Sequence, residues 1–373
     1  MIRKGLRTLL LSLPMLVLTG YLLTGGRLPA DWPHRAGVLT VFVVFNSFFM
    51  LMLHTGKTDR WRAPLFITTA LLFAVSFMGT MTEIYARQSG FVDFVFRDSV
   101  PMCPVVIPMM LVPTALSKTV IWPGAIAGSY AAIGLMFSIW LGASLALGKG
   151  WCGWGCFFGG WDEGFSRLLP RPLLAAPAWL RNLPYAVLIL FALLTAVSMM
   201  PAYCGLACPF KAATELPAGH FVTDGVLFWV HLLMFAGVTA AIPLLMKRRA
   251  QCAFFCPLGA LQNCVERVTP FEMRVDNGRC VKCGKCSREC PVMAIDQGDS
   301  VTIRSTCVKC GKCADNCPTK ALSFGIKGAE HAPDTARLLF LYPAFIFLTG
   351  FGGTLCADAI ARLILLVSTG RIF

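Results

Sequence analysis

The sequence predicts a polytopic α-helical membrane protein with about seven spans and a small cysteine-rich module inserted before the last span. Three observations predict this class. Of the 373 residues, 56% are hydrophobic and 14% are charged, whereas soluble domains carry about 25% charged residues. The apolar residues gather in runs as long as a membrane span. Between residues 269 and 328 these runs stop, and polar residues and cysteines replace them.

Six apolar runs have the length of one span, and one longer stretch is interrupted. The six predicted spans are Leu6–Leu23, Ala36–Leu53, Ala63–Thr82, Pro184–Met200, Phe221–Met246 and Ala336–Leu355. Prolines interrupt the first part of Pro104–Leu147, so we expect a re-entrant piece there, followed by one full span, Ile121–Leu147. The tail from Asp358 to Phe373 predicts an interfacial amphipathic helix. Four units result: N-terminal helices (1–103), a membrane core (104–268), the module (269–328), and a last span with its tail (329–373).

The net charge of +14 is typical of basic cytoplasmic loops in a membrane protein, so no nucleic-acid partner is expected. Most Lys and Arg residues fall on one predicted side: Arg3, Lys4, Arg7, Lys57, Arg60, Arg62, Lys149, Arg167, Arg171, Arg181, Lys247, Arg248 and Arg249. Fewer fall on the other: Arg27, Arg35, Arg87, Arg97, Lys211, Arg362 and Arg371. The positive-inside rule therefore predicts a bacterial inner-membrane protein whose N-terminus and module are cytoplasmic.

The module contains two copies of the spacing C-x2-C-x2-C-x3-C-P, beginning at Cys280 and Cys307. This spacing is typical of bacterial ferredoxins with two [4Fe–4S] clusters, in which the fourth cysteine of each copy binds the other cluster. Cluster 1 is therefore predicted at Cys280, Cys283, Cys286 and Cys317. Cluster 2 is predicted at Cys290, Cys307, Cys310 and Cys313. Zinc also binds C-x2-C pairs, but two full copies with the trailing proline favour iron–sulfur clusters.

Three C-x3-C pairs lie at predicted membrane boundaries: Cys152–Cys156, Cys204–Cys208 and Cys252–Cys256. Together with the double ferredoxin motif, the segments Cys152–Gly160 and Cys252–Ala260 resemble the NapH/NosR-type membrane polyferredoxins, over about half of the chain. The resemblance implies electron transfer between the quinone pool and a partner redox system. The chain departs from that pattern, because we expect three additional N-terminal spans and no flavin-binding domain. The resemblance therefore does not imply a particular respiratory substrate for this chain.

A tetrathiolate site needs four ligands, and one short loop provides only two. We therefore predict an inner metal site at Cys152, Cys156, Cys252 and Cys256. An outer metal site is predicted at Cys103, Cys204, Cys208 and Cys356. The alternatives are buried structural thiols and, on an oxidising outer face, two disulfides.

The predicted function is membrane-bound iron–sulfur electron transfer, in which the chain is an electron carrier or a quinol-dehydrogenase-like subunit. Electrons would pass between quinone or a cytoplasmic donor and a partner oxidoreductase, with additional subunits and membrane lipid as partners. Asp162 and Glu163, which closely follow Cys156, are the first candidates for a proton acceptor at a quinone site. Two alternatives stay open: an assembly or copper-handling factor that supplies electrons to a periplasmic cofactor, and a redox-sensing regulator.

Overall fold

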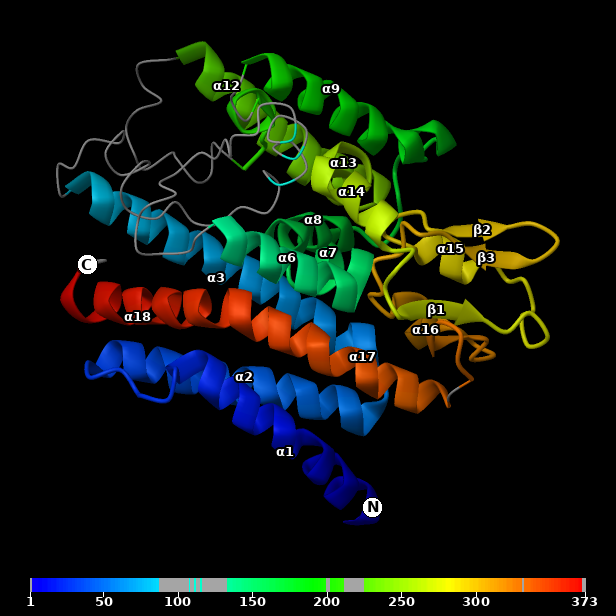
Figure 1. Cartoon of the computed structure of the whole chain (residues 1–373), viewed down its shortest axis with the longest axis horizontal. Helices are drawn as coiled ribbons and strands as arrows, with labels where there is room; N and C mark the ends of the chain where they lie inside the picture. Colours follow the sequence, from blue (N-terminus) through cyan, green and yellow to red (C-terminus); the bar gives the residue numbers. More distant parts are fainter. Residues whose placement is uncertain are drawn as a thin grey trace.

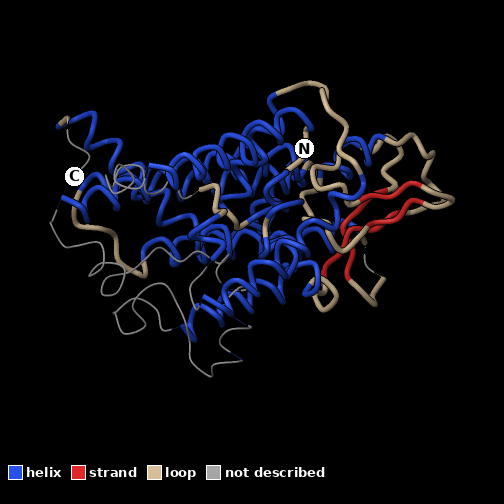
Figure 2. Tube along the Cα trace, turned by 90° about the horizontal axis from the view of Figure 1, so that it is seen from above, coloured by secondary structure: helices blue, strands red, loops and turns tan. Residues whose placement is uncertain are grey.

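The structure is a computed structural model that describes residues 2–86, 107, 111, 115, 133–198, 202–210, 225–330 and 332–370. Long helices run side by side, and a small unit that contains all the described strands lies at one end of the bundle (Figures 1 and 2). The longer helices are α1 (Ile2–Thr24), α2 (Trp32–Thr55), α3 (Thr58–Ala86), α6 (Ile133–Leu147), α9 (Leu183–Ser198), α12 (Gly225–Met234), α17 (Pro333–Leu348) and α18 (Thr354–Thr369).

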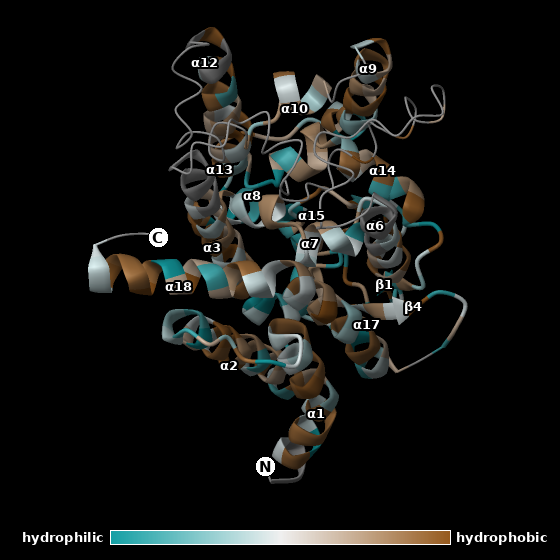
Figure 3. Ribbon diagram, turned by 60° about the vertical axis from the view of Figure 1, so that its left-hand side comes forward, coloured by the Kyte–Doolittle hydropathy of each residue, from teal (hydrophilic) through white to brown (hydrophobic). Residues whose placement is uncertain are grey.

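Six helical segments of the described chain are long and apolar enough to cross a membrane: Gly5–Thr24, Trp32–Thr55, Thr58–Gly79, Ala178–Ser198, Trp229–Met246 and Pro333–Thr369. Apolar side chains such as Val17, Val197 and Leu233 are largely exposed on them, and hydrophobic residues are frequent along the helices (Figure 3). Such a surface fits lipid rather than water. Of the predicted span Ile121–Leu147, the structure describes only the part that forms α6.

The predicted tail is helical as far as Thr369, where α18 ends. α17, a π-helical turn η8 (Thr349–Gly353) and α18 form one uninterrupted helical segment. α18 packs against α2 so closely that a Cβ atom at Gly37 would collide with the Ala357 carbonyl oxygen. Arg362 pairs with Asp358 at 2.8 Å, and Asp358 also accepts a hydrogen bond of 2.6 Å from Ser76 of α3. Asp358 therefore pairs with Arg362 of its own helix and with Ser76 of α3.

Five short helical segments fold back into the bundle: α7 (Trp151–Trp154), α8 (Phe157–Leu168), α10 (Ala202–Leu206), the π-helical turn η7 (Gln251–Phe255) and α14 (Pro257–Val265). Phe157 of α8 stacks on Phe73 of α3, with ring centroids 3.5 Å apart. A Cβ atom at Gly160 would lie 2.5 Å from the Ala70 Cβ atom. Close packing of this kind is typical of buried membrane helices that meet through small residues.

Short helical turns complete the membrane unit: η2 (Gly148–Gly150), η3 (Ala178–Asn182), the π-helical turn η6 (Phe235–Ala241) and α13 (Ile242–Met246). The module pairs β1 (Phe271–Val275) with β4 (Leu322–Ile326), and β2 (Ile295–Gln297) with β3 (Val301–Ile303), both antiparallel. Its helices are α15 (Lys285–Glu289) and α16 (Lys312–Asn316). Phe324 of β4 packs on Phe340 of α17, with ring centroids 5.2 Å apart, so the module is held against the membrane unit.

Candidate functional site

The module encloses two cavities, and each is lined by four cysteines. Cavity 1 is lined by Cys280, Cys283, Cys286 and Cys317. Cavity 2 is lined by Cys290, Cys307, Cys310 and Cys313. In each cavity three cysteines come from one copy of the motif and one comes from the other copy, which is the exchange that the spacing predicts.

The backbone around both cavities has the same form. Gly284 and Gly311 adopt φ angles of +73° and +81°, a left-handed conformation that glycine tolerates best. The amide of Ala294 donates to Cys290 Sγ, and the amide of Ala321 donates to Cys317 Sγ, both at 3.2 Å. Burial raises the pKa of Cys317, but hydrogen bonds from Thr319 and nearby amides outweigh it and lower this pKa below its ordinary value. The surroundings of Cys317 thus favour its thiolate form.

A single metal ion and an iron–sulfur cluster need different arrangements of the cysteines. In the described part of the chain, no three His, Cys, Asp or Glu side chains are placed to hold one metal ion. A structural zinc site needs four ligands within about 2.3 Å of one point. An iron–sulfur cubane binds each thiolate to a different iron, so its cysteines stand further apart around a larger volume.

A third cavity lies in the membrane unit and brings together the predicted inner set: Cys152, Cys156, Cys252 and Cys256. Cys156 and Cys256 are the N-cap residues of α8 and α14, and their backbones are alike (φ −84°, ψ 108° and φ −85°, ψ 117°). Two helix N-termini therefore begin at the cavity, and their positive ends favour an anionic ligand there. Tyr203 and Gln251 line the same cavity and hydrogen-bond to each other at 2.9 Å.

The predicted outer set is not brought together. Cys208 lines the third cavity beside the inner cysteines. Cys356 lies on α18, where its Sγ atom is 3.9 Å from the Thr69 carbonyl oxygen. The reason is that the chain after α9 folds back into the bundle, so that Phe210 packs on Phe158 with ring centroids 4.1 Å apart. Cys103 lies outside the described residues, and Cys204 packs near the third cavity's apolar lining.

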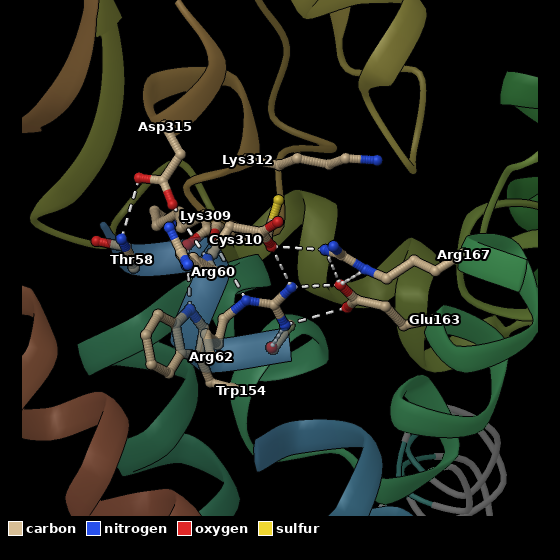
Figure 4. Close-up of polar contacts among 12 residues, drawn as sticks. Thr58, Arg60, Arg62, Trp154, Glu163, Arg167, Lys309, Cys310, Lys312 and Asp315 are labelled. Carbon is tan, nitrogen blue, oxygen red and sulfur yellow. Dashed lines mark hydrogen bonds and ion pairs between the residues drawn. The ribbon is translucent and has the colours of Figure 1, made fainter. Parts of the chain in front are cut away.

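Arg62 of α3 contacts both Gly153, in the loop between Cys152 and Cys156, and Cys310, which lines cavity 2 (Figure 4). Its guanidinium is 1% exposed and donates to the Gly153 carbonyl oxygen at 2.7 Å and to the Cys310 carbonyl oxygen at 3.2 Å. Trp154 Nε1 donates to the Lys309 carbonyl oxygen at 3.1 Å. The loop between Cys152 and Cys156 is therefore in direct contact with the loop that holds cavity 2.

The two copies of the motif share the letters C-V-K-C-G-K-C but have opposite environments. Val281 and Cys283 of the first copy are exposed, with Val281 at 63%. Val308 and Cys310 of the second copy are buried, with Val308 at 1%. Cavity 1 therefore faces the surroundings of the module, and cavity 2 faces the membrane unit.

The two carboxylates proposed for quinone chemistry have structural partners. Glu163 is fully buried and pairs with Arg62 and with Arg167, the latter at 2.5 Å, while Arg249 lies 3.7 Å away. Asp162 Oδ2 accepts a hydrogen bond of 2.9 Å from the Cys252 amide. A carboxylate held by three arginines is a poor proton acceptor, so Glu163 is better described as the centre of an ion-pair network.

The contact between the third cavity and cavity 2 can be tested at Gly153. A Cβ atom there would lie 2.5 Å from the Val308 carbonyl oxygen, which is backbone and cannot move aside easily. We expect Gly153→Ala to lower the free energy of unfolding by about 1–3 kcal/mol. Gly142→Ala is the matched control, because its Cβ atom meets nothing within 4 Å and alanine favours helix by about 1 kcal/mol. Equal stability of both variants in denaturant titrations would contradict the contact.

The fold combines six candidate membrane-spanning helices with a cysteine-rich module, and known families match both parts of the chain. Residues 272–318 match the model of a 4Fe-4S dicluster domain. Residues 130–174, 183–223 and 228–275 match, one after another, the model of a 4Fe-4S binding domain. The chain is therefore an iron–sulfur protein, and each of the three successive matches contains one C-x3-C pair.

Two curated relatives are similar over part of the chain. The chain is 28% identical over 182 residues to the protein of Escherichia coli K12 named "Putative electron transport protein YccM". It is 30% identical over 158 residues to an uncharacterised protein of Methanocaldococcus jannaschii. These matches cover 45% and 40% of this chain, and 48% and 61% of the relatives. No solved structure matches the chain.

Sequence reasoning missed the buried cations that surround the third cavity. Arg62, Lys149 and Arg249 are all buried, although each lies in a segment that hydropathy assigns to a basic cytoplasmic loop. The sequence does contain a signal for two of these cations. Lys149 and Arg249 each precede the first cysteine of a C-x3-C pair by three residues.

Proposed function

We propose that this protein is a membrane-bound electron relay with three iron–sulfur sites. Cavities 1 and 2 would each hold a [4Fe–4S] cluster through the cysteines that line them. The third cavity would hold a further cluster through Cys152, Cys156, Cys252 and Cys256. Electrons would pass between a redox partner at cavity 1 and a second partner or quinone at the membrane unit. The observation that carries this proposal is the direct contact of the loops around cavity 2 and the third cavity.

When bound, the clusters supply one-electron oxidation and reduction. The protein holds them by thiolates, and the amides of Ala294 and Ala321 stabilise negative charge on two of the sulfur atoms. The buried loop from Val308 to Cys310 excludes water between cavity 2 and the membrane unit. The exposed Cys283 leaves cavity 1 accessible to a soluble partner.

The proposed orientation places the module in the cytoplasm. Lys57 Nζ, in the basic loop between α2 and α3, donates to the Asp315 carbonyl oxygen at 2.8 Å. The Thr58 amide donates to the Asp315 carboxylate at 3.0 Å. The module thus lies at the end of the bundle where basic loops are frequent, and such loops are typical of the cytoplasmic side.

Iron and acid-labile sulfide per chain test the third site on anaerobically purified protein. We expect about twelve irons if the third cluster is a cubane, or about ten if it is binuclear, because two ferredoxin cubanes account for about eight. The double variant Cys152→Ser/Cys252→Ser should fall to about eight irons and keep the two ferredoxin signals in electron paramagnetic resonance. Cys264→Ser is the control, because this cysteine is exposed and lies outside the cavity. Eight irons in the unaltered protein would overturn the third site.

A further inference from the structure

We propose that Lys149 and Arg249 are a matched pair of counter-cations for the cluster in the third cavity and that they raise its reduction potential. The inference rests on the proposed third site. The cysteines would bind the cluster, and the two buried cations would place positive charge beside it.

The two cations are equivalent residues of two repeats. Lys149 precedes Cys152 by three positions, and Arg249 precedes Cys252 by three positions. Each reaches across to the other repeat: Arg249 Nη2 donates to the Cys152 carbonyl oxygen at 2.6 Å, and Lys149 Nζ donates to the Gly259 carbonyl oxygen. The middle pair has Pro201 at this spacing. A cation therefore precedes only the two C-x3-C pairs whose four cysteines line the third cavity.

Both cations lack sufficient negative charge from the protein. Lys149 is 3% exposed, and no carboxylate of the described chain lies within ion-pair distance of its side chain. Arg249 is fully buried. Of its two carboxylate neighbours, Glu163 is shared with Arg62 and Arg167, and Asp162 accepts a hydrogen bond from the Cys252 amide. A buried cation is costly unless an anion compensates it.

The cavity offers the missing anion at close range. Arg249 Nη2 lies 3.2 Å from Cys252 Sγ, and Arg249 Nε has no hydrogen-bond partner among the described residues. Lys149 Nζ reaches Gly259, three residues after Cys256. An oxidised cluster whose core carries two positive charges is a dianion when four thiolates bind it. Two cations match this charge.

The same cations favour reduction. When the third cluster accepts one electron from the cluster in cavity 2, the cavity-2 cluster is oxidised and the third cluster gains one negative charge. Fixed positive charge beside a cluster stabilises its reduced form, and charge near a cluster is one of the factors that set its potential. Removing either cation should therefore make the potential of the third cluster more negative.

A redox titration followed by electron paramagnetic resonance tests this on the full-length protein in detergent. Lys149→Met keeps the length of the side chain and removes its charge, so the third-cluster signal should shift to a more negative potential. Lys149→Arg should restore the potential. Lys247→Met is the matched control, because Lys247 donates to the Pro170 carbonyl oxygen at 2.9 Å and does not line the cavity. The ferredoxin signals report whether each variant is folded.

The outcomes separate this inference from the proposed function. If Lys149→Met keeps twelve or ten irons and the potential of its third cluster does not shift, the proposed role of the cation is wrong. The third site itself would then stand. Loss of the third cluster in Lys149→Met with recovery in Lys149→Arg would support charge compensation, whereas loss in both would overturn it. Eight irons in the unaltered protein would overturn both proposals.

Discussion

Lys309→Met should lower the free energy of unfolding by about 3–5 kcal/mol, because it leaves a buried carboxylate without its cation. Lys309 Nζ lies 2.5 and 2.6 Å from the two carboxylate oxygens of Glu266, and its side chain is 1% exposed. Burial raises the pKa of Glu266 and lowers that of Lys309, so desolvation already works against this pair. The measurement is denaturant unfolding in mixed micelles, followed by circular dichroism.

The first copy of the motif supplies the matched control for this variant. Lys282 occupies the same place in C-V-K-C and is exposed, so Lys282→Met should change the free energy of unfolding by less than about 0.5 kcal/mol. The double variant Lys309→Met/Glu266→Gln should recover part of the loss, because no unpaired charge remains. Equal effects of Lys309→Met and Lys282→Met would contradict the docked position of the second copy.

Glu163→Gln should have a similarly large effect, lowering the free energy of unfolding by about 3–5 kcal/mol, because it leaves buried arginines without a shared anion. Glu163 is 0% exposed and joins α8 to Arg62 of α3 and to Arg249. Thermal unfolding of the variant in detergent measures the loss. Glu289→Gln is the control: Glu289 pairs with Lys312 at 2.8 Å but is 33% exposed, and an exposed pair contributes about 0–1 kcal/mol. Equal melting temperatures for the two variants would show that the network is not a stabilising centre.

The ferredoxin module could be predicted from sequence because its chemistry is local. The irons of one cubane require three thiolates within a few residues, so spacing alone grouped Cys280, Cys283 and Cys286 and assigned Cys317 to the same cavity. The membrane unit is different, because hydropathy does not separate a helix that faces lipid from one that is buried among other helices.

The short helical segments that fold back into the bundle show this limit of hydropathy most clearly. α8 is too short to span a membrane, so hydropathy places it between spans, yet it packs inside the bundle on Phe73. Cys208 follows a predicted span and was assigned to the outer side, but the returning chain carries it to the third cavity. In α18, Arg362 indicated an interface, and the structure pairs it with Asp358 one turn earlier in the same helix. The position of α8 depends on the contact of Phe73 with Phe157, which lie far apart in the sequence.

The unequal burial of the two ferredoxin loops has a consequence for how the protein matures. Cluster assembly requires a delivery protein to reach the cysteine thiols. Cys283 is exposed in the finished fold, so the cluster in cavity 1 can be inserted or repaired late. Val308 and Cys310 are covered by the loop that contains Gly153 and Trp154. A cluster held by cavity 2, as proposed, would therefore be inserted before the module docks, and docking would then cover it.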